Sequence, residues 1–150
     1  MIKVIKATKH HLDDIAELFD AYRQFYGMPP DPVSSKAFIG ERMERKESQV
    51  YLASYQGVSA GFIQIYPSFS SVSMFPIWIL NDLYVHPDFR RRKVAEHLLC
   101  HLELEAKLQG IGRISLETAP DNINAQALYL NHQFEKSPFL IFEKDMPGEN

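Results

Sequence analysis

The sequence predicts an α/β fold in which helices cover a mixed β-sheet. Short stretches that alternate apolar and polar residues indicate strands, and between them apolar residues recur at helical spacing. The predicted order, β-α-α-β-β-β-α-β-α-β, is typical of a single layered domain. The chain has 150 residues, 45% of them hydrophobic and 23% charged, which suffices for one core. We therefore expect residues 1–150 to form one domain.

The first part of the chain predicts a strand followed by two helices. Ile2–Ala7 alternates apolar and polar residues, and Thr8 then offers a cap to a helix that continues to Phe25. Three prolines within Tyr26–Pro32 predict a loop, because proline cannot donate a backbone hydrogen bond. Val33–Lys46 is predicted to be a second, charge-rich helix.

Three strands are expected in the middle of the chain. Gln49–Tyr55 and Ala60–Tyr66 are predicted strands joined by a tight turn at Gln56-Gly57. The serine-rich segment Pro67–Ser73 is predicted to be a connection. Ile77–Val85 is strongly apolar and is therefore expected at the centre of the sheet.

The last part predicts a long amphipathic helix that ends at Gln109-Gly110. Arg113–Thr118 is a predicted strand, Asn124–Asn131 a short helix and Phe139–Lys144 a final strand.

Composition excludes several functional classes. A net charge of −3 argues against a dedicated nucleic-acid binder. The longest apolar run, Phe75–Leu80, is too short to span a bilayer, and the amino terminus lacks the apolar core of a signal peptide. A single cysteine, Cys100, is typical of a reducing compartment. We expect a cytoplasmic protein without nucleic-acid or membrane partners.

A basic turn between a strand and a helix is the most informative segment. The strand Ile77–Val85 is followed by a proline, by the four cations Arg90–Lys93 and then directly by a helix. The first N–H groups of a helix lack internal partners and carry partial positive charge, so this place suits a phosphate group. The alternative interpretation is a solvated charge run or a nucleic-acid patch.

The segment VHPDFRRRKVAEHLL (residues 85–99) resembles the pyrophosphate-binding segment of the GNAT superfamily of N-acetyltransferases, whose core pattern is R/Q-x-x-G-x-G/A. Arg90 matches the first position and Ala95 the last. The resemblance implies a splayed mixed sheet and acetyl-coenzyme A as co-substrate. It also implies that backbone N–H groups cradle the pyrophosphate, and these belong to Arg91, Arg92, Lys93, Val94 and Ala95.

Arg91 and Lys93 depart from this pattern, because the family usually has glycine at both positions. A lysine in the left-handed region costs about 1–2 kcal/mol, whereas in a helix lysine is favoured over glycine by about 1 kcal/mol. We therefore expect helical backbone geometry at Lys93.

A second segment, DNINAQALYLNHQF (residues 121–134), resembles the later family pattern N-x-x-A-x-x-L-Y-x-x-x-G-F. Gln133 stands where the family usually has glycine. The resemblance implies that Asn122 binds the pantetheine arm or caps the short helix, and that Ala125 belongs to the same cofactor-binding segment. It also places Tyr129 beside the thioester sulfur, as the general acid that protonates the leaving thiolate. The alternative is that Tyr129 is a core aromatic.

The strand ILNDLYV (residues 79–85) is similar to the L-E-D-F-F-V segment of diamine and polyamine acetyltransferases, in which the acidic pair faces the amine. Asn81 cannot act as a base, so the resemblance moves that role to Asp82 or to water. A bulge, frequent in this strand of the family, would decide which side chain faces the groove. The backbone N–H groups of Leu83, Tyr84 and Val85 are expected to polarise the acetyl carbonyl.

Few residues of the sequence indicate where the acceptor amine binds. Tyr22 and Asp31, at the loop of residues 26–32, occupy the place where GNAT enzymes hold the acceptor. His97 and His101 flank Cys100 at helical spacing, but no further ligand cluster accompanies them, so no metal is expected.

The resemblance to the GNAT superfamily implies an enzyme that transfers an acetyl group directly from acetyl-coenzyme A to a primary amine, most simply that of a small molecule. A protein lysine or an amino terminus is the alternative acceptor, and a catalytically idle acyl-coenzyme A-binding module is the alternative outside the enzyme class. Family habit and the apolar segment Phe139–Phe142 suggest a homodimer.

Overall fold

The structure, a computed structural model, describes residues 1–148. Within residues 1–150 the chain divides into two compact units, Met1–Glu117 and Thr118–Asn150. Among the described residues, the first unit contains the sheet and three α-helices, and the second contains one helix.

The first unit is built on a five-stranded sheet with the strand order β1-β2-β3-β4-β5. The first four strands pair antiparallel, and β5 pairs parallel with β4. Their bounds are β1 Ile2–Lys6, β2 Gln49–Tyr55, β3 Val58–Ser70, β4 Phe75–Val85 and β5 Arg113–Leu116. This mixed sheet with flanking helices confirms the predicted fold class.

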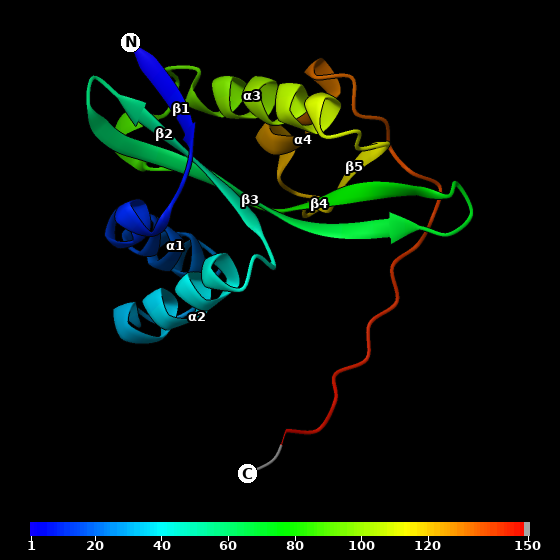
Figure 1. The fold of residues 1–150 in the computed structure, drawn as a ribbon, viewed down its shortest axis with the longest axis horizontal. Coiled ribbons are helices and arrows are strands. Elements are labelled where there is room, and N and C mark those ends of the chain that lie inside the picture. The colour runs from blue at the N-terminus through cyan, green and yellow to red at the C-terminus, as the bar shows by residue number, and fades with distance from the viewer. Residues whose placement is uncertain (149–150) are drawn as a thin grey trace. The chain divides into compact units, whose positions relative to one another are not determined.

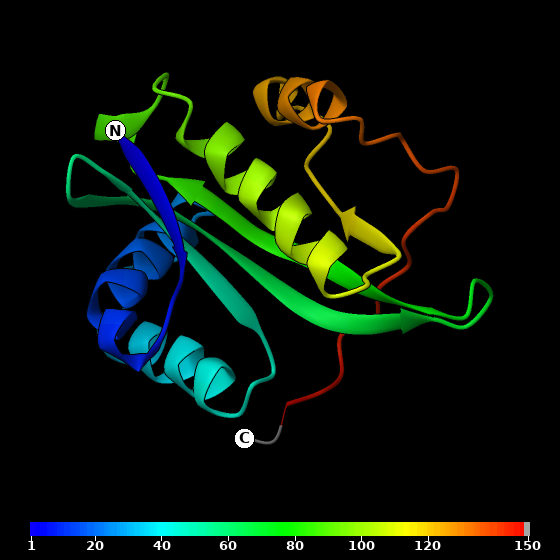
Figure 2. The same cartoon turned by 45° about the horizontal axis from the view of Figure 1, so that its top comes forward.

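Helices cover both faces of this sheet. Figures 1 and 2 show α3 (Val94–Leu108) on one face, and α1 (Leu12–Phe25) with α2 (Pro32–Glu44) on the other. Short 3₁₀ helices at Lys9–His11 and Pro87–Phe89 precede α1 and α3. Thr8 caps the first of them, as its sequence position predicted.

The α1 face contains a continuous core. Ile15 and Phe19 of α1 and Ile39 of α2 pack with Phe62 of β3 and Tyr84 of β4, and all five are buried. Burial of such side chains contributes about 1.5–3 kcal/mol each, so this core fixes the two helices against the strands that carry the site.

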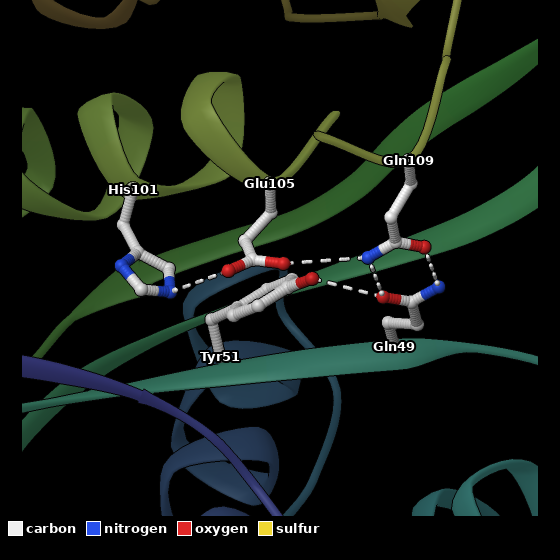
Figure 3. A network of polar contacts seen from close by, with 5 residues as sticks. All are labelled: Gln49, Tyr51, His101, Glu105 and Gln109. Carbon is white, nitrogen blue, oxygen red and sulfur yellow. Dashed lines mark hydrogen bonds and ion pairs between the residues drawn. The ribbon is translucent and has the colours of Figure 1, made fainter. Parts of the chain in front are cut away.

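A polar network fixes α3 to the opposite face (Figure 3). The Tyr51 hydroxyl donates to Gln49 Oε1 at 2.9 Å, and the Gln49 and Gln109 amides exchange hydrogen bonds at 3.2 and 3.3 Å. Gln109 also donates to Glu105, whose carboxylate lies 3.9 Å from His101 Nε2. Burial and the nearby carboxylate of Glu105 raise the pKa of Tyr51 to about 12, so its hydroxyl stays a donor. The network ties the carboxyl end of α3 to β2.

The predicted connection at residues 67–73 is wrong in its first half. Pro67–Ser70 continues β3 and pairs with residues 75–78 of β4, so the two strands form a long hairpin (Figure 1). Serine and proline have low strand propensity, but pairing with an apolar partner strand outweighs that preference. Only the turn before Phe75 is a connection.

The second unit contains α4 (Ile123–Asn131). Asn122 caps it, because its side-chain oxygen accepts from the N–H of Ala125 at 3.2 Å. The predicted final strand is wrong, since residues 139–144 carry no strand in the structure. An apolar run forms a strand only when its backbone groups find a partner strand, and none is hydrogen-bonded to this segment within the described residues.

Candidate active site

The basic turn adopts a left-handed backbone at two positions. Arg90 is extended, with φ −70° and ψ 155°, whereas φ is 62° at Arg91 and 64° at Lys93. The predicted helical geometry at Lys93 is therefore wrong. The chain must leave the 3₁₀ helix and turn sharply before α3 begins at Val94, and residues with positive φ make that turn.

The turn leaves N–H groups of α3 open. Lys93 is the N-cap and makes no side-chain cap hydrogen bond. Within residues 1–148, none of the hydrogen bonds of the structure uses the N–H of Val94, Ala95 or Glu96. These three residues line a cavity of about 250 Å³ together with Val85, Phe89, Arg90, Arg91 and Lys93. A concave site with cationic walls and open helix N–H groups suits a phosphate-bearing ligand.

The four cations have different surroundings. Arg90 Nε donates to the carbonyl of Val85 at 3.1 Å, so this side chain fastens the turn to the end of β4. Arg92 donates to the Tyr55 hydroxyl at 3.1 Å and does not line the cavity. Arg91 and Lys93 line the cavity and form no ion pair within the described residues.

A bulge in β4 re-aims Asp82. Leu80 pairs with Ile65, whereas Asp82 pairs with Gln64, so Asn81 is an extra residue. Adjacent residues of β3 face opposite sides of the sheet, and Leu80 and Asp82 therefore do so as well. Asp82 thus shares the α1 face with Gln64.

Two side-chain amides donate to the Asp82 carboxylate, which is only 2% exposed. The side-chain amide of Gln64 donates to Oδ2, and that of Asn81 donates to Oδ1 at 2.9 Å. Burial raises the pKa of Asp82, while hydrogen bonds from Gln64, Asn81 and Tyr22 oppose that rise. The result is a buried carboxyl whose pKa lies above its usual range, as a group that takes up a proton requires.

A second cavity of about 480 Å³ opens at this carboxyl on the α1 face. Its walls come from α1, α2, β3 and β4, and they are Phe19, Tyr22, Arg23, Ser34, Ser35, Phe38, Tyr66, Asn81 and Asp82. The volume is that of a site for a small molecule.

Comparison with known proteins decides the family. The sequence model of the "Acetyltransferase (GNAT) family" matches residues 12–134, most of the chain. The chain belongs to the GNAT acetyltransferase family. The GNAT fold, the reaction class and acetyl-coenzyme A as co-substrate are thereby confirmed at the level of the family.

Individual relatives agree with this assignment to the GNAT family. The "Uncharacterized N-acetyltransferase YhfO" of Bacillus subtilis (strain 168) is 39% identical over 127 residues, which cover 85% of each chain. A "Thialysine N-epsilon-acetyltransferase" of Caenorhabditis elegans is 25% identical over 132 residues, 85% of this chain and 79% of that protein. The crystal structure of "a probable acetyltransferase" is 42% identical, covers 98% of this chain and 99% of the other, and superposes with a TM-score of 0.90.

The structure gathers some of the predicted GNAT site residues and not others. Val85, Arg90, Arg91, Lys93, Val94 and Ala95 line the smaller cavity, and Asn81 and Asp82 line the larger one. Leu83, Tyr84 and Arg92 line neither. Asn122, Ala125 and Tyr129 lie in the second unit, where the Tyr129 ring packs edge-on against Phe134 at 5.7 Å between centroids.

The two residues expected near the acceptor, Tyr22 and Asp31, lie in different surroundings. Tyr22 lines the larger cavity and donates to the carbonyl of Asn81 at 3.2 Å. Asp31 instead caps α2, because its carboxylate accepts from the N–H of Ser34.

Among residues 1–148, no group of three or more histidine, cysteine or acidic side chains could hold a metal ion. Nor is any helix in that range long and apolar enough to cross a membrane.

Sequence reasoning missed Gln64, Tyr66 and Arg23. Gln64 is completely buried in the middle of an apolar strand, and a buried polar residue in such a run was the available signal. Tyr66 follows two positions later and so shares its face. Arg23 carried no comparable signal, because an arginine in the last turn of a helix is ordinary.

Proposed function

We propose that this GNAT enzyme transfers the acetyl group of acetyl-coenzyme A directly to the primary amine of a small molecule. One observation supports the proposed acceptor site. The bulge at Asn81 orients the buried carboxyl of Asp82 toward a cavity the size of a small metabolite. The smaller cavity, with its open helix N–H groups, supports pyrophosphate binding three residues further along the same strand, where β4 ends at Val85.

Asp82 is the proposed base. An alkyl amine has a pKa near 10.4 and must lose a proton to attack, either to a carboxylate or to an intervening water. Asn81 cannot accept that proton, but its amide holds the Asp82 carboxylate at 2.9 Å. We therefore propose that Asn81 positions the carboxylate and that Asp82 accepts the proton of the amine.

The backbone of β4 is the proposed site of carbonyl polarisation. β5 pairs with β4 only over Ile77–Leu80, so within the described residues no strand is hydrogen-bonded to Asn81–Val85 on that edge. N–H groups alternate between the two edges of a strand, and the N–H of His86 donates to Ala60 on the β3 side, so the N–H of Tyr84 also points to β3. The N–H groups of Leu83 and Val85 face the open edge and would stabilise charge that develops on the acetyl oxygen.

Tyr129 is the proposed general acid. In the proposed reaction the amine nitrogen bonds to the acetyl carbon and the carbon–sulfur bond breaks. The phenol of Tyr129 then protonates the leaving thiolate. Its support is the match to the second family segment, in which the tyrosine follows an asparagine cap, as Asn122 caps α4 here.

A small acceptor is supported by the volume of the larger cavity and by the thialysine acetyltransferase among the relatives. A panel of small primary amines, tested beside lysine-containing peptides and peptides with free amino termini, tests it by thiol release and product mass. We expect at least one small amine to exceed every peptide in kcat/KM. Preference for a peptide would replace the small acceptor with a protein.

The remaining proposals concern assembly. We propose one acetyltransferase domain over residues 1–150, a homodimer and a cytoplasmic location. The exposed apolar segment Phe139–Phe142 supports self-association, and an exposed free thiol at Cys100 is typical of a reducing compartment. Light scattering at micromolar concentration should give twice the chain mass, and a monomer mass would remove the dimer.

A further inference from the structure

Arg23 has a buried donor group without an acceptor. The residue lies in the last turn of α1 and lines the larger cavity beside Tyr22. Its Nη1 is shielded from solvent and makes no hydrogen bond. No ion pair within residues 1–148 involves this guanidinium.

The nearest acidic residue of the same helix does not fill this gap. Asp20 accepts hydrogen bonds from the Ser35 hydroxyl at 2.7 Å, from the N–H of Asp31 at 3.0 Å and from Gln24 at 3.1 Å. The bond from Ser35 is the strongest influence, and together with the other two bonds and the nearby charge of Arg23 it lowers the pKa of Asp20 against the opposing effect of burial. Asp20 thus joins α1 to the start of α2 and does not line the cavity.

The charge of Arg23 acts on Asp20, but a buried donor that makes no hydrogen bond still costs free energy, so most such donors are paired or serve a ligand. The cavity would supply the missing partner if its ligand carried an anionic group. A guanidinium binds a carboxylate with two parallel hydrogen bonds, which gives both affinity and orientation. A ligand with positive charge at both ends would instead place one cation beside Arg23.

On the basis of the proposed function, we propose that the acceptor is a small primary amine that also carries a carboxylate, which Arg23 binds. Its amine then lies at the Asp82 end of the same cavity and its carboxylate at the α1 end. Arg23 determines specificity and takes no part in proton transfer. Simple diamines and polyamines are poorer acceptors for this chain.

Matched pairs of amines test this preference. L-Lysine is compared with pentane-1,5-diamine and L-ornithine with butane-1,4-diamine, because each pair differs only in the carboxylate. The kcat/KM of the wild type should favour the amino acid in at least one pair by about tenfold or more. Preference for the diamine in both pairs would overturn the proposal.

Two variants separate recognition from a structural role. In Arg23→Gln the preference should fall at least tenfold, because KM rises for the amino acid and falls for the diamine. Arg45→Gln, which removes an exposed arginine of the same charge paired with Glu41, is the control and should leave the preference in place. If Arg23→Gln weakens both amines equally, the proposal is wrong.

Failure of the reaction itself is distinguishable. If no amine of either pair is acetylated, the proposed acetyl transfer to these amines fails, and calorimetry of the same amines decides the inference. Binding of the amino acid that exceeds binding of its diamine and is lost in Arg23→Gln supports recognition of the carboxylate. Equal binding of both overturns it.

Discussion

Gln64 donates its side-chain amide to the carboxylate of Asp82 across the β3–β4 pair, and both side chains are buried. The donor favours the ionised carboxylate, whereas burial favours the neutral acid. The balance between these two influences sets the pH at which the proposed base can act.

Gln64→Leu should therefore move the acidic limb of the kcat/KM profile to higher pH. The variant removes a hydrogen bond to the ionised form, so the pKa of Asp82 rises further. A larger fraction of Asp82 is then protonated at a given pH and cannot act as a base. The pH–rate profile measures the shift, and Gln49→Leu, in the network on the α3 face, is the control. An unmoved acidic limb would mean that Asp82 does not control the rate.

Much of this arrangement was predictable from the sequence, because periodicity reports which residues face a core. β2 was predicted with its observed bounds, and α1 and β4 within a few residues of theirs. The bulge was expected from the family resemblance, but only cross-strand register shows that Asn81 is the extra residue and that Asp82 faces α1.

Other features depend on partners that a single sequence does not show. Pro67–Ser70 forms a strand because residues 75–78 pair with it. Phe139–Lys144 does not form a strand, because no partner strand pairs with it within the described residues. The backbone at Lys93 was predicted from side-chain preference. The connection between two helices requires positive φ there whatever the side chain is.

Lys93→Gly should stabilise the protein by about 1 kcal/mol. A left-handed backbone costs lysine about 1–2 kcal/mol, and the greater freedom of glycine in the unfolded chain offsets part of the gain. Urea denaturation measures the change. Lys36→Gly, the same substitution inside α2, should instead destabilise by about 1 kcal/mol. Destabilisation by both substitutions would contradict the left-handed geometry.

The charges that line the smaller cavity should control cofactor affinity. Arg91→Gln combined with Lys93→Gln is expected to raise the Kd for acetyl-coenzyme A at least about tenfold, because both side chains are free to meet phosphate. Calorimetry gives the Kd. Arg92→Gln, whose guanidinium is held by Tyr55, should change it by less than about threefold. The reverse order of effects would place the pyrophosphate elsewhere.

Tyr129→Phe should lower kcat by about 10²-fold and leave the Kd for acetyl-coenzyme A within about twofold of the wild type. The phenol is proposed to act only as the carbon–sulfur bond breaks, and phenylalanine keeps the ring that packs on Phe134. Steady-state kinetics and calorimetry separate the two quantities. Normal turnover would identify Tyr129 as a core aromatic, and lost affinity with normal kcat would identify a binding hydroxyl.

Asp82→Asn separates a catalytic carboxyl from a structural one. The folded state keeps the proton of Asp82 to a higher pH than the unfolded chain does, so wild-type stability falls as pH rises from the usual aspartate range, near 3.8, through the raised pKa. The asparagine variant lacks this loss and should be the more stable protein at neutral pH, with the difference vanishing below the usual range. The two melting temperatures, compared from about pH 3 to pH 8, check this expectation.

The most direct test of the account is acetyl transfer by Asp82→Asn at saturating acetyl-coenzyme A and neutral pH, with the best amine of the panel as acceptor. We predict that kcat falls by about 10²–10⁴-fold, while the Kd for acetyl-coenzyme A stays within about twofold and the melting temperature does not fall. Turnover at the wild-type rate would contradict the assignment of Asp82 as the base. Loss of activity together with a lowered melting temperature would show that the carboxyl serves the fold instead.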